Sequence, residues 1–139
     1  MQKYFEQNDV FTSWCGARLI RCAPGEAELQ LTLEEKHLSR VGRAHVHAGV
    51  LYTLAESASA AAILSYGYNA YAVEGNITYF DAVSEGTVTA AAKGKDEHEK
   101  GSGSCRVRLV AEDGRIIAKA VFSIFYTGEP FAIPPDAQE

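Results

Sequence analysis

The amino-acid sequence predicts an α+β domain in which an antiparallel β-sheet wraps around one long buried helix. Segments in which apolar and polar residues alternate recur along the chain, which is typical of strands with one buried face. One stretch, over about residues 48–66, shows no alternation, contains no proline and is rich in alanine. It is long enough for roughly five helical turns of ~3.6 residues each. A single dominant helix among several strands indicates a layered α+β architecture.

Length and composition fit one globular domain. The chain has 139 residues and a single core typically serves ~100–200, so residues 1–139 are predicted to form one domain. Hydrophobic residues make up 47% of the chain, which excludes disorder as its main state. The formal charge of −5 argues against a nucleic-acid partner, but it is compatible with a local basic patch for a small phosphorylated ligand.

The cysteines and the apolar segments bear on location. Cys15, Cys22 and Cys105 are odd in number and irregularly spaced, which favours a reducing compartment over a disulfide framework. The polar first eight residues lack the apolar core of a signal peptide. The longest nearly uncharged window, 48–73, is rich in Ala, Ser and Gly and is a poor membrane span. We therefore expect a cytoplasmic protein with no membrane partner.

The elements outside the long helix follow from local patterns. A short amphipathic helix is expected over about residues 1–14, and a loosely held, proline-containing tail over about 128–139. Turn signals at Pro24-Gly25 and Asp113-Gly114 precede two of the alternating segments. The last strand is apolar on both faces, so it is expected to be central and covered on both sides. The five predicted strands span 27–33, 71–80, 87–93, 105–109 and 116–126.

The predicted helix over 48–66 has no charged face. Leu51, Leu54 and Ala58 form an apolar stripe, and the other side carries small residues with a single charge, Glu56. A helix that is apolar or small on all sides is buried on all sides, which is why we expect the sheet to wrap around it. Its small residues would also allow close approach of a second layer, such as a partner subunit.

Two features of this helix point to chemistry. Its start, at His47-Ala48-Gly49, leaves backbone N–H groups that can bind an anion or a developing oxyanion. Glu56 is the only charged residue between Arg43 and Glu74. A carboxylate on a buried helix is costly unless it is hydrogen-bonded or has a function. Glu56 is thus a candidate catalytic group, with a hydrogen-bonded structural carboxylate as the alternative.

The residues around Glu56 resemble the hotdog-fold thioesterase superfamily. In its branch of phenylacetate-degradation and mammalian acyl-CoA thioesterases, a His-Gly-Gly turn opens the central helix and an acidic residue follows nine positions after the His. His47 and Glu56 have this spacing, and the segment 76–79, Asn-Ile-Thr-Tyr, resembles the Asn-Ile-x-Tyr strand of the branch. The resemblance covers about 27–126. It implies a hotdog fold and an acyl-CoA thioesterase that hydrolyses a thioester to free acid and CoA.

The resemblance also implies roles for individual residues. Glu56 corresponds to the carboxylate that attacks the thioester carbonyl or activates water. The backbone N–H of Ala48, beside Gly49, corresponds to the oxyanion donor, and His47 to the histidine that shapes the turn. A cap or packing role for His47 is the alternative. The family arrangement implies a homodimer or homotetramer in which the carboxylate and the turn amide come from different subunits, and no cofactor apart from the CoA of the substrate.

The chain departs from the family pattern at two places. Relatives carry Asn or Gln six residues before the turn histidine, where this chain has Val41. Asp81 follows the Asn-Ile-x-Tyr segment, where relatives often have another polar residue. Asp81 is a candidate substrate-binding residue whose charge would raise the pKa of Glu56 if the two were close. A simple turn residue is the alternative for Asp81.

Binding of CoA phosphates would require basic residues near the site. One group clusters in sequence around a predicted flexible loop over 94–103, whose acidic residues could equally balance it on a solvated hairpin. A second pair precedes the helix. The candidate phosphate-binding residues are Lys93, Lys95 and Lys100 of the first group, with Arg106 nearby, and Arg40 and Arg43 of the second.

Other functions fit the sequence less well. A non-catalytic acyl-CoA-binding protein is the main alternative, because Val41 replaces a polar residue of the catalytic relatives. A hotdog hydratase or dehydratase is less favoured, since its histidine lies farther upstream of the acid, and the position fourteen before Glu56 is Gly42. No metal site is expected, because His45 and His47 have no third ligand at a clear spacing.

Overall fold

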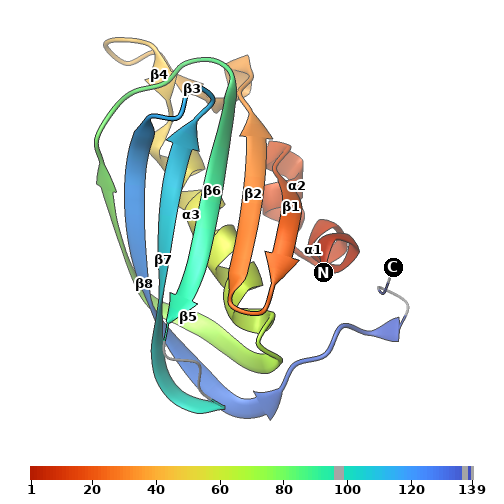
Figure 1. The fold of residues 1–139 in the computed structure, drawn as a ribbon. Helices are drawn as coiled ribbons and strands as arrows, with labels where there is room; N and C mark the ends of the chain where they lie inside the picture. The colour runs from red at the N-terminus through yellow and green to blue at the C-terminus, as the bar shows by residue number, and fades with distance from the viewer. Residues whose placement is uncertain (96–98, 136–137, 139) are drawn as a thin grey trace.

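The structure, a computed structural model, describes residues 1–95, 99–135 and 138 and confirms an antiparallel sheet packed against one long helix (Figure 1). The helix α3 spans Ala48–Leu64. Six strands are ordered β1-β2-β6-β7-β8-β5, and every neighbouring pair is antiparallel. The strands are β1 Arg18–Ala23, β2 Glu26–Thr32, β5 Tyr68–Tyr79, β6 Thr87–Lys95, β7 Lys100–Ala111 and β8 Ile116–Pro130.

The core lies between α3 and the inner face of the sheet. Leu54, Ala58 and Ala62 of the helix are at most 1% exposed, as the predicted all-round burial requires. Val107 and Phe122 face them from β7 and β8 and are equally buried. Alanines on a helix let a sheet approach closely, so the burial of α3 follows from its composition.

The N-terminal segment forms two helices instead of the single helix expected over 1–14. They are α1, Gln2–Asn8, and α2, Val10–Cys15. Asp9 separates them because its side chain caps α2: its Oδ1 accepts a hydrogen bond from the Thr12 N–H at 3.3 Å. Smaller elements precede α3: the 3₁₀ turn η1 Glu35–His37 and the two-stranded ladder of β3 Leu38–Ser39 and β4 His45–Val46.

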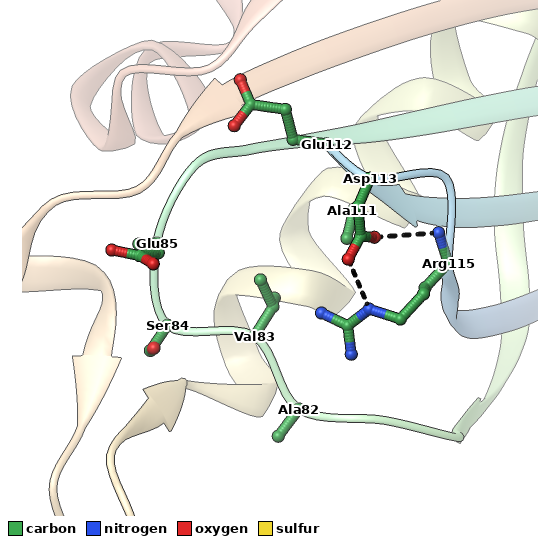
Figure 2. A pocket seen from close by; sticks show the side chains of 8 residues that line it. All are labelled: Ala82, Val83, Ser84, Glu85, Ala111, Glu112, Asp113 and Arg115. Carbon is green, nitrogen blue, oxygen red and sulfur yellow. Dashed lines mark hydrogen bonds and ion pairs between the residues drawn. The ribbon is translucent and has the colours of Figure 1, made fainter.

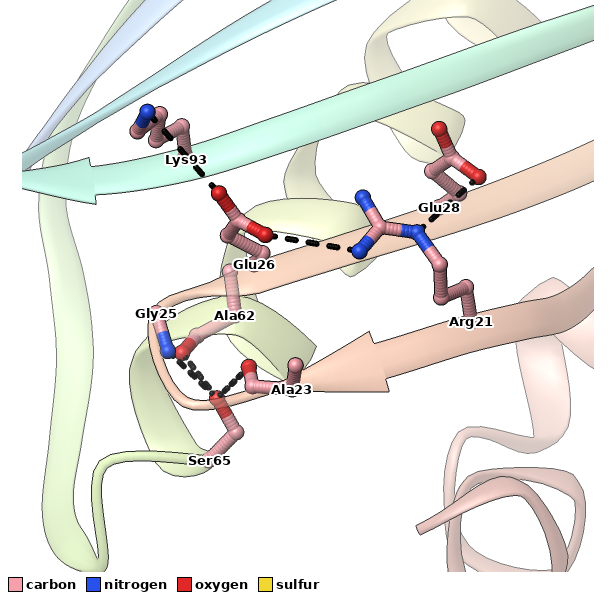
Figure 3. Close-up of polar contacts among 8 residues, drawn as sticks. All are labelled: Arg21, Ala23, Gly25, Glu26, Glu28, Ala62, Ser65 and Lys93. Carbon is pink, nitrogen blue, oxygen red and sulfur yellow. Dashed lines mark hydrogen bonds and ion pairs between the residues drawn. The ribbon is translucent and has the colours of Figure 1, made fainter.

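A serine at the C-terminal end of α3 ties the helix to the β1–β2 turn (Figure 3). The Ser65 Oγ accepts a hydrogen bond from the Gly25 N–H at 2.8 Å. Its hydroxyl lies 2.6 Å from the carbonyls of both Ala23 and Ala62, and it can donate to either. Together with the packing of the alanines, this contact fixes the position of α3 on the sheet. It thereby also fixes the N-terminal end of α3, where the candidate site begins.

Three expectations about the C-terminal half are wrong in part. The last strand is interior, but its outer face is uncovered, with Val121 42% and Phe125 36% exposed. The start of the tail expected to be loose over 128–139 is anchored, because β8 reaches Pro130 and the Phe131 N–H donates to the Gly67 carbonyl at 2.8 Å; residues 136, 137 and 139 lie outside the described residues. Most of the loop expected over 94–103 is strand, with its backbone groups in the β6, β7 and β8 ladders; residues 96–98 lie outside the described residues.

None of the helices in the described part of the chain has both the length and the apolar composition needed to cross a membrane.

Candidate active site

The start of α3 is built around His47. The His47 carbonyl accepts the first bond of the helix from the Val50 N–H at 2.9 Å, and its side-chain Nδ1 accepts from the Gly49 N–H at 2.8 Å. An Nδ1 that accepts leaves the ring proton of the neutral imidazole on Nε2. The structure therefore gives His47 the cap role, one of the two alternatives derived from the sequence.

The cap decides which backbone amide is free. The Gly49 N–H is occupied by His47, whereas the Ala48 N–H makes no hydrogen bond to any residue that the structure describes. Ala48 is also exposed in the isolated chain. An unpaired amide at a helix N-terminus carries partial positive charge and can bind a developing oxyanion. The Ala48 amide, which is the predicted donor, is therefore available for this task, whereas the neighbouring Gly49 amide is not.

Contacts from three other segments of the chain hold the helix start in place. The Tyr79 hydroxyl, at the end of β5, donates to the Ala48 carbonyl at 3.3 Å. The Val46 N–H donates to the Val83 carbonyl at 2.7 Å, and the His47 N–H to the His37 carbonyl at 2.8 Å. Because three separate segments fix this turn, the direction of the Ala48 amide is preorganised.

Glu56 is half-buried on α3 without a compensating partner. Its carboxylate forms no hydrogen bond or ion pair with any of the described residues. Burial, and then the negative charge of Asp9, raise the pKa of Glu56 above its ordinary value. A hydrogen-bonded structural carboxylate would have its pKa lowered, so the contacts within one chain do not support the structural alternative.

The carboxylate that acts on Glu56 is Asp9, which the sequence analysis missed. The Ser57 hydroxyl donates to Asp9 Oδ2 at 2.7 Å, and the Thr12 hydroxyl lies 2.7 Å from the same Ser57 oxygen. Ser57 and Thr12 are both buried. The sequence signal for Asp9 is its place as an N-cap, directly before a helix that begins with two apolar residues. Its contact with Ser57 could not be predicted, because the two residues are 48 positions apart.

Replacing Asp9 by asparagine is expected to shift the acid limb of the pH–rate profile to lower pH. In the catalytic role that the sequence predicts for Glu56, only the ionised carboxylate can act as nucleophile or base, so activity is expected to rise as the pH passes its pKa. Removing the Asp9 charge takes away one cause of the raised pKa, while asparagine keeps the oxygen that caps α2. Ser57→Ala is the control, since it removes the hydrogen bond but keeps the charge. An unmoved limb in Asp9→Asn, or the same shift in Ser57→Ala, would contradict the electrostatic coupling.

Glu56 and the free amide of Ala48 cannot meet within one chain. They are eight residues apart on α3, and a helix rises 1.5 Å per residue, which puts them about 12 Å apart along the axis. A carbonyl carbon must lie about 3–3.5 Å from its nucleophile while its oxygen reaches the oxyanion donor. Glu56 and the Ala48 amide of one protomer therefore cannot act on the same carbonyl group.

Asp81 lies away from Glu56 and is neutralised. Its carboxylate accepts from the Arg115 guanidinium at 2.6 Å and from the Ala82 N–H at 2.8 Å. These two partners lower its pKa. Arg115 also pairs with Asp113 at 2.8 Å, beside the pocket of about 380 Å³ in Figure 2. The condition under which Asp81 would raise the pKa of Glu56 is not met within the chain, because Asp81 pairs with Arg115 and the charge that acts on Glu56 is that of Asp9.

The structure divides the predicted phosphate-binding residues among separate places. Arg40 forms a two-pronged ion pair with Glu35, at 2.7 and 2.8 Å. Arg43 lines a pocket of about 290 Å³ that also contains Asp81 and Arg115. Lys100 packs its side chain against Gly128. Lys93 and Lys95 lie on the outer face of β6, and they are described further below. These residues do not form one phosphate clamp within a protomer.

The three thiols have the properties of packing residues. Cys15 and Cys105 are buried and Cys22 is half-buried. Burial raises the pKa of each thiol, which lowers the fraction of reactive thiolate. Glu56 is thus a better candidate for the reacting side chain than any cysteine.

Solved structures of other proteins share this arrangement of sheet and helix. The PaaI protein of the Escherichia coli phenylacetic acid degradation operon superimposes with a TM-score of 0.83 at 23% identity, over 94% of this chain and 97% of that one. A mutant form of the phenylacetic acid degradation protein PaaI from Thermus thermophilus is 31% identical, with a TM-score of 0.76, over 84% and 98%. A hypothetical thioesterase from Streptococcus pneumoniae, solved with coenzyme A, is 20% identical with a TM-score of 0.78, over 89% and 98%.

The family assignment rests on the sequence of the segment that carries the site. The thioesterase superfamily profile matches residues 44–118, more than half of the chain. The matched segment includes the His47 turn and the whole of α3. It also includes the strands β5, β6 and β7. Together with the hotdog architecture shared with the PaaI proteins, this match shows that the chain belongs to the thioesterase superfamily.

Proposed function

We propose that this protein hydrolyses acyl-CoA thioesters to the free acid and CoA, with Glu56 as the reacting carboxylate. The observation that carries the proposal is an unpaired, half-buried carboxylate with a raised pKa on the helix whose first amide is free. Burying a carboxylate without a partner costs free energy of folding, so its presence on this helix indicates a function. Family membership narrows that function to thioester chemistry.

The proposed chemistry needs only these two groups. A thioester carbonyl is electrophilic, and a thiol of pKa ~8.5 is a good leaving group. Glu56 attacks the carbonyl carbon directly, or removes a proton from a water that attacks it. In both routes the carbonyl oxygen becomes negative and is stabilised by the Ala48 N–H. When the C–S bond breaks, the thiolate leaves as CoA and takes up a proton.

The active unit in this proposal is a homodimer at least, because Glu56 and Ala48 of one chain are too far apart. The edge strand β5 is the surface that a second copy would cover. Among the residues that the structure describes, it pairs only with β8, and Tyr71 and Val73 on it are 56% and 60% exposed. A long uncovered edge with exposed apolar residues favours pairing with another strand. Joining two chains at this edge would bring Glu56 of one towards the Ala48 turn of the other.

Arg43 is the proposed contact for a CoA phosphate near this site. Arg43 forms no ion pair with the described residues. Its carbonyl accepts a hydrogen bond at 2.6 Å from the Nδ1–H of His45, which lies two residues before His47. Arg40 is less suited, since Glu35 already neutralises it. The coenzyme A complex of the Streptococcus pneumoniae protein supports CoA as a ligand of this fold.

A binding-only role is the second candidate. Val41, in the loop before the helix, is 86% exposed. Its apolar side chain offers no polar group to hold a water or a carbonyl. In that case the protein would bind acyl-CoA without releasing CoA.

Free-thiol release from short, medium, long and aromatic acyl-CoA esters tests the proposal, with binding of each ester measured in parallel. We expect release from at least one ester with kcat/KM of about 10⁴ M⁻¹s⁻¹ or more, as is typical of enzymes on their substrates. Binding without release would favour the acyl-CoA-binding role. Neither binding nor release, from a folded and oligomeric protein, would overturn the proposal.

A further inference from the structure

The outer face of the sheet, on the side away from α3, contains a groove of about 640 Å³ lined by basic residues. Its basic residues come from four strands although the whole chain is acidic, with a formal charge of −5. We call it the cationic groove. The residues that define it are Arg21, Lys93, Lys95, Arg106, Arg108 and Lys119.

The register of the strands places like charges directly opposite each other in this groove. Lys93 of β6 faces Arg106 of β7, and Arg108 of β7 faces Lys119 of β8. Like charges directly opposite in an antiparallel pair destabilise the sheet. Two like-charged pairs side by side lower the stability of the sheet, and proteins keep such unfavourable arrangements mainly at functional sites.

Acidic neighbours neutralise only one end of the cationic groove. Glu26 lies 3.3 Å from Arg21 and 3.8 Å from Lys93, and Glu28 lies 3.4 Å from Arg21 (Figure 3). At the other end, the three cations of β7 and β8 have no ion-pair partner among the residues that the structure describes. These are Arg106, Arg108 and Lys119.

The floor between these charges is open. On β6, Ala91 is the neighbour of Arg108, and its small side chain fills little of the space. The volume falls within the range of about 300–1,000 Å³ that small-molecule sites occupy. Guanidinium groups bind phosphate oxygens with two parallel hydrogen bonds, which suits Arg106 and Arg108 to phosphate.

We propose that the cationic groove binds a small anion that carries two or more phosphate groups. Such a ligand would offset both like-charged pairs at once. A second copy of the chain does not fit the groove, because it would present the same excess of positive charge. The ligand has two sources: the bisphosphate nucleotide of CoA, a source that rests on the proposed function, or a free diphosphate, which does not.

Calorimetric titration of the intact protein with pyrophosphate, and separately with adenosine 3′,5′-bisphosphate, tests the proposal. We expect saturable binding that weakens as salt is raised, and a loss of about tenfold in affinity in Arg108→Gln, since the variant loses a charge-assisted hydrogen bond to the anion. Arg18→Gln, which removes a cation outside the groove, should bind like the wild type. Lys119→Gln provides a second groove variant.

Thermal unfolding adds a readout that an unrelated surface effect would not produce. Without ligand, Arg108→Gln should melt at a higher temperature than the wild type at low salt, because one like-charged pair is gone. Pyrophosphate should raise the melting temperature of the wild type and of Arg18→Gln, and raise that of Arg108→Gln and Lys119→Gln much less. No saturable binding of either anion, or equal affinity in the groove variants and Arg18→Gln, would overturn the proposal.

The two ligand sources give different results. If the source is CoA, adenosine 3′,5′-bisphosphate binds more tightly than pyrophosphate, and pyrophosphate competes with acyl-CoA. If it is a free diphosphate, pyrophosphate binds at least as tightly and does not compete. Neither titration contains a thioester, so failure of the hydrolysis proposal would leave these measurements interpretable, and loss of anion binding would leave hydrolysis testable.

Discussion

Replacement of Glu56 by glutamine is expected to lower kcat/KM for thioester hydrolysis by roughly 10²–10⁴-fold, the contribution typical of a positioned acid–base group. Glutamine keeps the size of the side chain but can neither attack the carbonyl nor accept a proton. Free-thiol release with the best ester of the panel measures the effect. Glu129→Gln is a matched control, because this exposed carboxylate lies at the end of β8.

The same substitution is expected to stabilise the protein at neutral pH. The pKa of Glu56 is raised in the folded state. Its contribution to the free energy of unfolding is therefore fully present below the pKa of the unfolded chain and is lost as the pH rises through the pKa of the folded chain. Glutamine avoids this loss, and we expect a gain on the order of 1 kcal/mol near pH 7. The gain should vanish below about pH 4, where the glutamate is protonated in both states.

These two effects together separate a catalytic carboxylate from a structural one. A structural carboxylate would lose its partners in Glu56→Gln and lower the melting temperature. Unchanged thiol release by the folded variant would remove Glu56 from the reaction. Lower stability together with full activity would make it a structural residue.

Val73→Lys is expected to convert the proposed dimer to a monomer and to lower hydrolysis by about 100-fold or more, because the oxyanion donor proposed to come from the second chain would be lost. Val73 lies on the edge strand β5 at the irregularity in the β5–β8 register, and it is 60% exposed. The pairing with β8 continues on both sides of Val73, so the substitution should not disrupt the sheet of one chain. A charge at a strand edge opposes pairing with another strand. Ile20→Lys is the matched control, since β1 is the other edge of the sheet and Ile20 is 48% exposed.

Sedimentation equilibrium and circular dichroism, read beside thiol release, check the result. A Val73→Lys protein that remains dimeric would place the interface elsewhere. A wild-type protein that is monomeric and active would contradict a site made from two chains.

Mixed dimers give a direct test of whether the two halves of the site come from different chains. Ala48→Pro removes the proposed oxyanion donor at the first helical position, where proline is well tolerated. A 1:1 mixture of Ala48→Pro and Glu56→Gln chains should recover about a quarter of the wild-type activity, since half of the dimers are mixed and each has one intact site. No recovery after proven subunit exchange would mean that each chain works alone.

Most secondary structure follows from local patterns in the sequence. The alternating segments became strands β2, β5, β6, β7 and β8, and the alanine-rich stretch became α3. The strand β1 was missed because its residues 18–23 do not alternate, and its register shifts between Leu19 and Arg21. The Asp9 break between α1 and α2 was missed for a related reason, since one capping side chain changes the chain direction within an otherwise continuous segment.

The candidate site divides in the same way. Glu56 and the His47 turn could be found from the sequence, because a lone charge on an apolar helix and a helix start are local features. The pairing of Asp81 with Arg115, across 34 residues, could not, because only the folded chain brings them to 2.6 Å.

The sequence by itself determined the five strands with alternating residues, the long buried helix, the family and the carboxylate on that helix, since each depends on residues that are neighbours along the chain. The tertiary structure alone decided that Asp9 acts on Glu56 and that Arg115 pairs with Asp81. It also aligned Lys93 with Arg106 and Arg108 with Lys119 on one face of the sheet. The physical reason is that strand register and helix packing set distances between residues far apart in sequence, and electrostatic interactions depend on those distances.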